Sequence, residues 1–192
     1  HFRQFFHDPA SPNSLPENFV KEITLAPDGS LWTSSNRGIC RIDPGTLEFH
    51  RFALPESSDT LDNDWVGRVV FDSQGMGWVC AEKGLYQFDL RTGQYGFFPI
   101  DLVNAGYFHT HIDPKDRIWL IDKNIISFFD TKNKTLRRFD TTSPGSPYRD
   151  AALLHVQHDQ RGRVWIGSWF KGLFWYDEVQ DSIVDYPDLN NT

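Results

Sequence analysis

Three histidines are the side chains whose type and spacing come nearest to a metal site. His109 and His111 stand two residues apart, so on a strand both point to one face, and His155 holds the same place as His109 in a later copy of a repeat. Three imidazoles could bind zinc or copper. Equivalent positions on adjacent sheets are expected about 10 Å apart, which is too far for one ion. We therefore predict no metal here, and interpret the histidines as part of a polar ring that has Glu22 and Arg68 in the other copies.

Acidic residues recur in turns, but each turn has too few of them to form a calcium site, which favours a structural role. The D-x-x-G turn that begins at Asp159 offers one carboxylate, and a calcium loop needs several. A turn aspartate that accepts hydrogen bonds from its own backbone explains the pattern. Two carboxylate pairs, Asp62 with Asp64 and Asp113 with Asp116, fall on linkers and turns. We interpret them as solvated loop residues and not as a general acid–base pair.

Motifs for other chemistries are missing from the sequence. It contains no G-x-S-x-G, phosphate-binding glycine loop, H-E-x-x-H or C-x-x-C, so we predict neither catalytic residues nor a cofactor. The net charge of −7 and the lack of a basic run argue against nucleic acid as a partner. No apolar window approaches the ~18 residues of a membrane span, so no membrane contact is expected. Cys40 and Cys80 are expected to be buried thiols, although a disulfide is left open.

One stretch, DQRGRVWIGSWFKGLFWYD at residues 159–177, shows the kind of secondary structure that positions these residues. It reads as two aromatic-rich strands with a glycine turn before each, which is typical of hairpins. Its tryptophan recurs along the chain at spacings of 46, 41 and 46 residues. The periodic tryptophans are Trp32, Trp78, Trp119 and Trp165. An aspartate that ends a strand follows eleven or twelve residues later, at Asp43, Asp89, Asp130 and Asp177.

Each copy of the repeat is predicted to hold four short strands. Apolar residues precede each periodic tryptophan, and an outer strand is predicted at 49–52, 95–98, 136–139 and 183–186. A repeat of this length with four strands is typical of a β-propeller blade, because one sheet cannot bury both of its faces alone. A β-sandwich would not place one equivalent tryptophan in every copy. The predicted fold is therefore an all-β propeller fragment of four four-stranded blades, near residues 14–53, 58–99, 104–140 and 150–187.

The residues also resemble the two-component regulator propeller repeat. The linker FRQFFHDPASPNSLPENFV at 2–20 is similar to the family pattern F-x-x-Y-x-H-D-P-x-x-P-x-S-L-x-x-N-x-V, and residues 54–66 repeat it loosely. The D-x-x-G-x-x-W turn at 159–165 and G-L-x-x-F-D at 84–89 also match. Thr33-Ser34 and Val79-Cys80 depart from the Ile-Gly that is usual there. The resemblance covers nearly the whole chain.

This resemblance implies a function that the repeat alone does not show. The family forms periplasmic sensor regions of membrane-bound bacterial receptors that drive a histidine kinase or a diguanylate cyclase. It implies a non-catalytic ligand-sensing or interaction region, in a parent receptor that self-associates. The alternatives are a secreted propeller enzyme acting on polysaccharide, such as a lyase or glycosidase, and a structural dimerisation module.

The four copies are expected to be part of a larger ring. Residues 2–6 read as the outer strand of a preceding blade, and the tail DYPDLNNT resembles the start of another linker. The alternatives are a closed ring of four blades, or a half ring that is completed by a second copy.

A ligand is expected on the face where the linkers and the second-to-third-strand turns emerge. Aromatic planes there can stack on a sugar, and cations can bind a carboxylate or sulfate. A carbohydrate or an anionic small molecule is therefore the predicted ligand, although the tryptophans could instead only cover blade edges. The predicted binding residues are Asn36, Arg37, Trp65, Lys83, Tyr107, Lys123, Tyr148, Arg149, Trp169 and Lys171.

Overall fold

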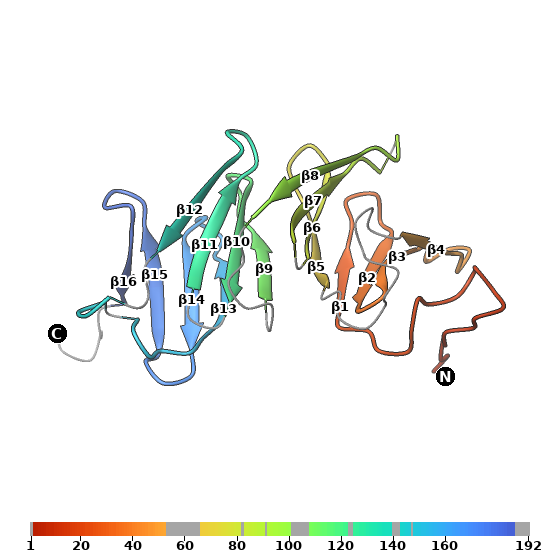
Figure 1. Cartoon of the computed structure of the whole chain (residues 1–192), viewed down its shortest axis with the longest axis horizontal. Helices are drawn as coiled ribbons and strands as arrows, with labels where there is room; N and C mark the ends of the chain where they lie inside the picture. The colour runs from red at the N-terminus through yellow and green to blue at the C-terminus, as the bar shows by residue number, and fades with distance from the viewer. Residues whose placement is uncertain are drawn as a thin grey trace. The chain divides into compact units, whose positions relative to one another are not determined.

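The computed structural model contains sixteen β-strands in four sheets, and these are shown in Figure 1. It describes residues 2–52, 66–81, 83–90, 92–100, 108–122, 125–139, 143–146 and 148–186. Within these residues no helix is long and apolar enough to span a membrane. The chain divides into two compact units, residues 1–102 and 103–192.

The first unit holds two four-stranded antiparallel sheets whose strands follow sequence order. The first sheet consists of β1 (Glu22–Leu25), β2 (Leu31–Ser35), β3 (Gly38–Ile42) and β4 (Phe49–Phe52). The second consists of β5 (Val66–Phe71), β6 (Gly77–Ala81), β7 (Gly84–Phe88) and β8 (Tyr95–Pro99). Strand β5 packs on β1 and β2 of the first sheet. The sheets therefore meet face to face along their inner strands.

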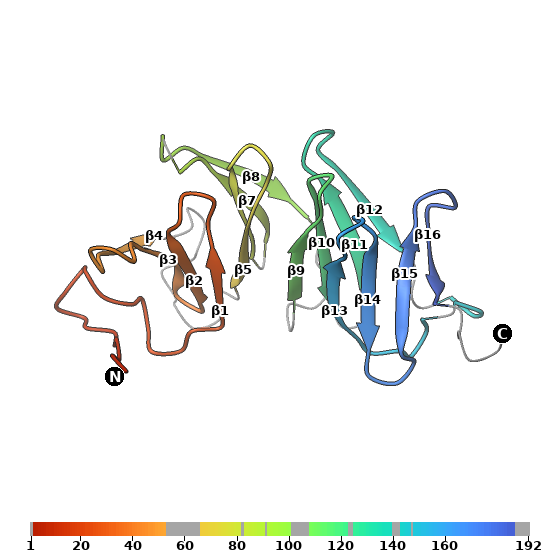
Figure 2. The same ribbon diagram turned by 180° about the vertical axis from the view of Figure 1, so that it is seen from behind.

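The second unit repeats this arrangement. One sheet consists of β9 (Phe108–Ile112), β10 (Arg117–Asp122), β11 (Ile125–Asp130) and β12 (Thr135–Phe139). The other consists of β13 (Leu153–His158), β14 (Val164–Ser168), β15 (Leu173–Asp177) and β16 (Ser182–Asp185). Strand β13 lies beside β9 and β10, as both Figure 1 and Figure 2 show. The predicted all-β fold of four four-stranded blades is thus confirmed.

Each periodic tryptophan is joined to the turn that precedes its strand. The indole Nε1–H donates to Oδ2 of an aspartate six residues earlier, at 2.8 Å for Trp78 and Asp72 and at 2.9 Å for Trp119 and Asp113. Oδ1 of Asp113 also accepts the backbone N–H groups of Lys115 and Arg117. One carboxylate therefore closes the turn and satisfies the buried indole, which confirms the turn role of these aspartates. The interpretation of Asp113 and Asp116 as solvated was wrong, because the packing of the indole and guanidinium leaves them only 3% and 4% exposed.

In the first copy the indole N–H is satisfied by a different residue, because Ala26 occupies the position of the aspartate. The Trp32 indole donates to Ser30 Oγ at 3.1 Å, and Ser30 Oγ donates to Asp28 Oδ1 at 2.5 Å. The fourth copy keeps the direct bond, from Trp165 to Asp159 at 3.1 Å. The interaction is thus present in all four sheets.

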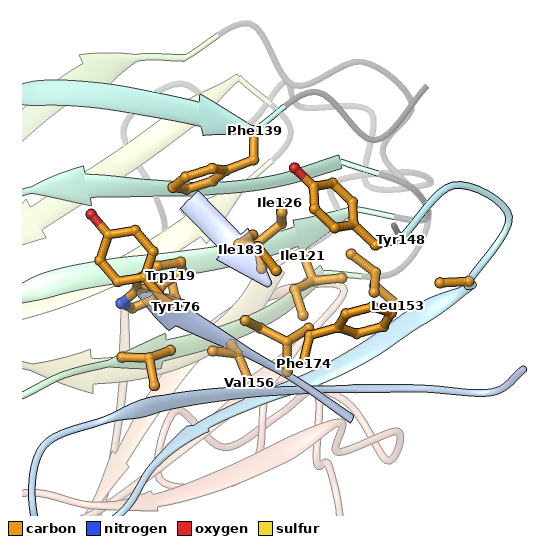
Figure 3. Packing of buried hydrophobic residues seen from close by; sticks show 13 residues of the cluster. Trp119, Ile121, Ile126, Phe139, Tyr148, Leu153, Val156, Phe174, Tyr176 and Ile183 are labelled. Carbon is orange, nitrogen blue, oxygen red and sulfur yellow. The ribbon is translucent and has the colours of Figure 1, made fainter. Parts of the chain in front are cut away.

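Between the sheets of each unit, the tryptophan packs on an aromatic residue of the following sheet. The rings of Trp32 and Phe88 lie 5.1 Å apart, and those of Trp119 and Tyr176 also 5.1 Å. Figure 3 shows Trp119 and Tyr176 within the core of the second unit, whose side chains come from both sheets. Trp32 and Trp119 therefore fill the space between the two sheets of their units, as the sequence predicted.

An ion-pair network crosses the same interface in the second unit. Arg117 donates to Asp113 Oδ2 at 2.6 Å and to Glu178 Oε1 at 2.8 Å, and its guanidinium lies 5.1 Å from the Tyr176 ring centroid. Glu178 also accepts a hydrogen bond from Lys115. Burial lowers the pKa of Arg117, but the two carboxylates outweigh it and raise the pKa overall. The buried cation is therefore paired on both sides.

The linker that resembles the family pattern is held by Arg51. Its guanidinium donates to the carbonyl oxygens of Ser14 at 2.8 Å, Ser11 at 2.9 Å and Asp8 at 3.1 Å. Leu15 packs with Cys40 in a buried cluster. The linker motif therefore has a structural role, in that it fastens the chain onto β3 and β4.

Two further sequence predictions concern residues near this linker. Residues 2–8 form no strand; an outer strand at 2–6 would need a partner from another blade, and it stays a prediction. Cys40 and Cys80 are both buried and form no disulfide, as expected. Burial raises the pKa of the Cys40 thiol to about 11.

We predict that Asp113→Asn destabilises the protein by about 3 kcal/mol, because it leaves the buried Arg117 guanidinium without one of its carboxylates. The free energy of unfolding can be measured by urea titration followed by tryptophan fluorescence. Asp43→Asn is the matched control, since Asp43 caps an exposed turn through Gly45 and Thr46 without an indole partner. An equal loss in both variants would contradict the role of the indole and guanidinium bonds.

Acid should destabilise the protein partly through Glu178. The hydrogen bond from Lys115, together with Arg117, holds the pKa of Glu178 below its usual value. The pKa of a glutamate in the unfolded chain is about 4.3. A carboxyl whose pKa is lower than this in the folded protein stabilises the fold at higher pH, and this stabilisation is lost as the pH falls through the pKa of the folded state. The melting temperature of Glu178→Gln should therefore lie below wild type at pH 7 and approach it near pH 3. A difference that is constant between these pH values would contradict this account.

Candidate functional site

The predicted ligand-binding residues fall into three groups. Trp65, Tyr107 and Lys123 lie outside the described residues. Asn36, Arg37 and Lys83 belong to the first unit, where each lies in a turn between the second and third strands of its sheet. The N–H of Asn36 donates to the Glu17 carboxylate, and the N–H of Arg37 donates to Ser35 Oγ at 3.2 Å. The remaining four, Tyr148, Arg149, Trp169 and Lys171, lie in the second unit, on two segments whose backbones are hydrogen-bonded to each other at residues 151–152 and 169–170.

Trp169 forms an exposed aromatic pair with its neighbour Phe170, which we call the Trp169–Phe170 patch. The two side chains are 70% and 73% exposed, and their rings lie 6.1 Å apart at an interplanar angle of 89°. They occupy the turn between β14 and β15, which is closed by a hydrogen bond from the N–H of Ser168 to Gly172 O at 3.0 Å. Two large aromatic side chains are thus held in solvent by a short, well-bonded turn.

The backbone of the patch is hydrogen-bonded to the segment that leads into β13. The N–H of Trp169 donates to Ala152 O at 3.1 Å, and the N–H of Phe170 donates to Ala151 O at 3.3 Å. Ala151 is fully buried in the core of this unit. The backbone that presents the aromatic pair is therefore continuous with the core between the two sheets.

That segment also contains unusual backbone conformations. Asp150 and Ala152 have φ values of 58° and 49°, in the left-handed region that residues with a Cβ rarely adopt. Such strain persists only where the surroundings hold it, and it is often found at functional sites. The bonds from Trp169 and Phe170 to this segment supply that support.

The structure assigns different roles to the predicted residues of this group. Tyr148 is buried and packs edge-on against Phe174 at 6.1 Å, so it supports the site from inside. Arg149 is exposed and lies 3.7 Å from the Asp150 carboxylate, and Lys171 is exposed in the same turn as the aromatic pair. Phe170 was missed by the sequence reasoning, although the run Trp-Phe in a turn was a signal for it. The aromatic pair offers flat apolar surface, with Lys171 on the same turn and Arg149 on the segment bonded to it, which suits a sugar or an anion.

The histidines of the second unit lie much closer together than predicted. The ring centroids of His109 and His155 are 3.7 Å apart, and those of His111 and His158 are 4.9 Å apart. The expected separation of about 10 Å was wrong, because that spacing applies to the backbones of packed sheets and facing side chains extend into the space between them. The four rings therefore form two contacts between β9 and β13.

Hydrogen bonds define how these rings meet. Nε2 of His111 accepts the backbone N–H of His158 at 3.2 Å and lies 2.8 Å from Nδ1 of His158, so Nδ1 of His158 is the donor of this ring–ring hydrogen bond. Nε2 of His109 lies 3.1 Å from Val156 O and must donate to it, because a carbonyl oxygen only accepts. Within the described ranges no three His, Cys, Asp or Glu side chains are placed to hold one metal ion.

Comparisons with known proteins establish the fold. No protein-family model matches the sequence. The curated proteins likewise give no match. Solved structures do: the extracellular domains of BT4673 and BT3049, two proposed hybrid two-component systems of B. thetaiotaomicron, are 21% and 19% identical to the chain, with a TM-score of 0.69 each. They match 84% and 97% of this chain, which spans 22% and 24% of theirs.

A third solved structure shows that this fold also occurs in an enzyme. An inactive variant of virginiamycin B lyase from Staphylococcus aureus, solved with quinupristin, is 14% identical with a TM-score of 0.68. The match covers 92% of this chain and 59% of the lyase. The chain is thus an all-β protein of the β-propeller type, a class that includes both receptor domains and enzymes.

We predict that His109 carries its proton on Nε2 at neutral pH, because that nitrogen donates to Val156 O. Long-range ¹⁵N–¹H spectra of histidine-labelled protein distinguish the two neutral forms. Gln157→Ala, a change at an exposed neighbouring position of β13, should leave the His109 signals in place. A His109 ring protonated on Nδ1 alone would show that the contact with Val156 is not a hydrogen bond.

Proposed function

We propose that this chain is part of the extracytoplasmic ligand-sensing region of a membrane-bound bacterial signalling receptor, of the two-component or diguanylate cyclase type, and is not itself catalytic. The observation that carries the proposal is the Trp169–Phe170 patch, because two large exposed aromatic side chains on a well-bonded turn are typical of a binding surface. The linker pattern at 2–20 and the receptor domains with the same fold support this setting.

The proposed ligand is a carbohydrate or a small anion. Trp169 and Phe170 provide flat surfaces for stacking on a sugar ring, and Arg149 and Lys171 provide cations for a carboxylate or sulfate. The patch is well suited to such a ligand because its backbone bonds keep the aromatic pair in place before binding. Little ordering is then needed when the ligand arrives.

Signalling from this patch would use its connection to the core. The patch is bonded to residues 151–152, and Tyr148, Ala151 and Leu153 all belong to the cluster that joins the two sheets of the second unit. Figure 3 shows Tyr148 and Leu153 beside Phe174 in this cluster. A ligand that binds one packing of this interface more tightly than another shifts the population between them. In a receptor that self-associates, such a shift could be passed to a partner subunit.

A second candidate function is that of a propeller enzyme acting on polysaccharide. The observation in its favour is the pair of histidine contacts between β9 and β13, because a histidine can serve as an acid or base. Incubation with polysaccharides and detection of new reducing or unsaturated ends would test it. Turnover that is lost in His109→Ala and retained in Trp169→Ala would support the enzyme and contradict the sensor.

The sensor proposal predicts that Trp169→Ala removes ligand-induced stabilisation. Wild-type protein is screened by thermal denaturation against neutral and acidic oligosaccharides, and a saccharide that binds the folded state raises the melting temperature. Trp169→Ala should melt within about 2 °C of wild type without ligand, since the side chain is exposed, and should lose the shift with ligand. Val179→Ala, at a position that is 96% exposed in another turn, is the control. A shift that survives in Trp169→Ala would remove the patch from the proposal.

A further inference from the structure

The first unit contains a groove that none of the predicted ligand-binding residues lines. Its volume is about 580 Å³, within the range of small-molecule sites. It lies between the first and second sheets and is lined by β3, β4 and the turn between β7 and β8. Its lining includes the charged or polar side chains and the aromatic rings of Asp28, Arg41, His50, Phe52, Phe88 and Tyr95.

Strand register explains why cations and aromatic residues meet there. Arg41 pairs with Trp32 on one side and with His50 on the other, so all three side chains point to the same face of the first sheet. Phe52 stacks on Trp32 at 5.2 Å, and Phe88 of the second sheet approaches Trp32 at 5.1 Å. The base of the groove is therefore a well-packed aromatic layer that also forms the contact between the sheets.

On the charged side of the groove, only some of the hydrogen-bond donors have partners within the protein. Arg41 makes one ion pair among the described residues, with Asp28 at 3.3 Å, and both side chains are partly exposed. One such contact leaves most of the five N–H donors of a guanidinium available. The His50 ring is exposed and has no hydrogen bond or ion pair in the described part of the chain. Two nitrogen-rich side chains thus face the groove with donors available.

The opposite side provides a flat surface. Tyr95 is 40% exposed, and its ring lies 6.4 Å from that of Phe88. Burial raises the pKa of the Tyr95 hydroxyl, so it remains a neutral donor at physiological pH. A ring that is half buried and half accessible can stack on the apolar face of a sugar while its hydroxyl forms a hydrogen bond.

From these contacts we infer that the groove between the first two sheets is a second binding site, which takes an acidic saccharide unit. Arg41 and His50 bind its carboxylate, and Tyr95 stacks on its ring. A guanidinium recognises a carboxylate through paired N–H groups, and the aromatic wall distinguishes a sugar from an inorganic anion. This site lies in the first unit and does not depend on the Trp169–Phe170 patch, which belongs to the second.

The test is isothermal titration calorimetry of the whole chain with trigalacturonate, and with its fully methyl-esterified form as the uncharged counterpart. We expect binding of the acid, and binding of the ester that is weaker by at least about tenfold, because the ester lacks the charge-assisted hydrogen bonds. Arg41→Gln should weaken binding of the acid to a similar extent. Tyr95→Phe keeps the ring and removes only the hydroxyl, and should weaken it less than Tyr95→Ala.

Controls separate this site from the other proposal and from loss of folding. Arg3→Gln changes an exposed arginine elsewhere in the first unit and should bind trigalacturonate as wild type does. In Trp169→Ala, which removes the patch of the second unit, the preference for acid over ester and its loss on Arg41→Gln should both remain. Each variant is first checked for an unchanged melting temperature. Equal binding of acid and ester, unchanged affinity in Arg41→Gln, or absence of trigalacturonate binding to wild type would each overturn the inference. Equal competition by inorganic sulfate would overturn its saccharide part.

Discussion

The structure depends on one recurring interaction, in which a turn aspartate accepts both the backbone N–H groups of its own turn and the N–H of a buried indole. A tryptophan side chain contributes much apolar area, but its N–H must be satisfied when it is removed from water. Asp72 and Asp113 satisfy that group and set the turn with one carboxylate. The first copy, where Ser30 and Asp28 replace the direct bond, shows that satisfaction of the indole is what the fold requires.

The same interaction determines how neighbouring sheets meet. The hydrogen bond fixes the orientation of the indole, so that its ring contacts the next sheet. There Phe88 packs on Trp32 and Tyr176 packs on Trp119, each with ring centroids 5.1 Å apart. The interface of the second unit adds Arg117, whose charge is paired by a carboxylate of each sheet. The residues that hold the sheets together are therefore the ones that repeat. Their polar groups are already paired in these contacts and are not available for catalysis or ligand binding.

The candidate binding sites use positions at which the copies differ. The Trp169–Phe170 patch occupies a turn of four residues, 169–172, where the first copy has two, 36–37, and this allows the chain to expose two aromatic side chains. In the groove of the first unit, Arg41 stands opposite Trp32 where the third and fourth sheets have Phe128 and Trp175. Binding surfaces on these positions can vary without loss of the contacts that hold the sheets together. The connection of the patch to the core through Ala151 offers a route by which binding affects sheet packing.

The sequence by itself determined the sixteen strands, the tryptophan layer and the turn role of the aspartates, because strand alternation, turn chemistry and the repeat are local properties. It could not determine which side chains meet across an interface. The histidines were expected apart and lie in contact, because the sheet spacing says nothing of how far side chains extend between the sheets. Tyr148 was expected on the surface and is buried on Phe174, and Phe170 was overlooked. Burial in these cases depends on how the segment at 148–152 folds against the turn at 169–172, and only the tertiary structure decides that contact.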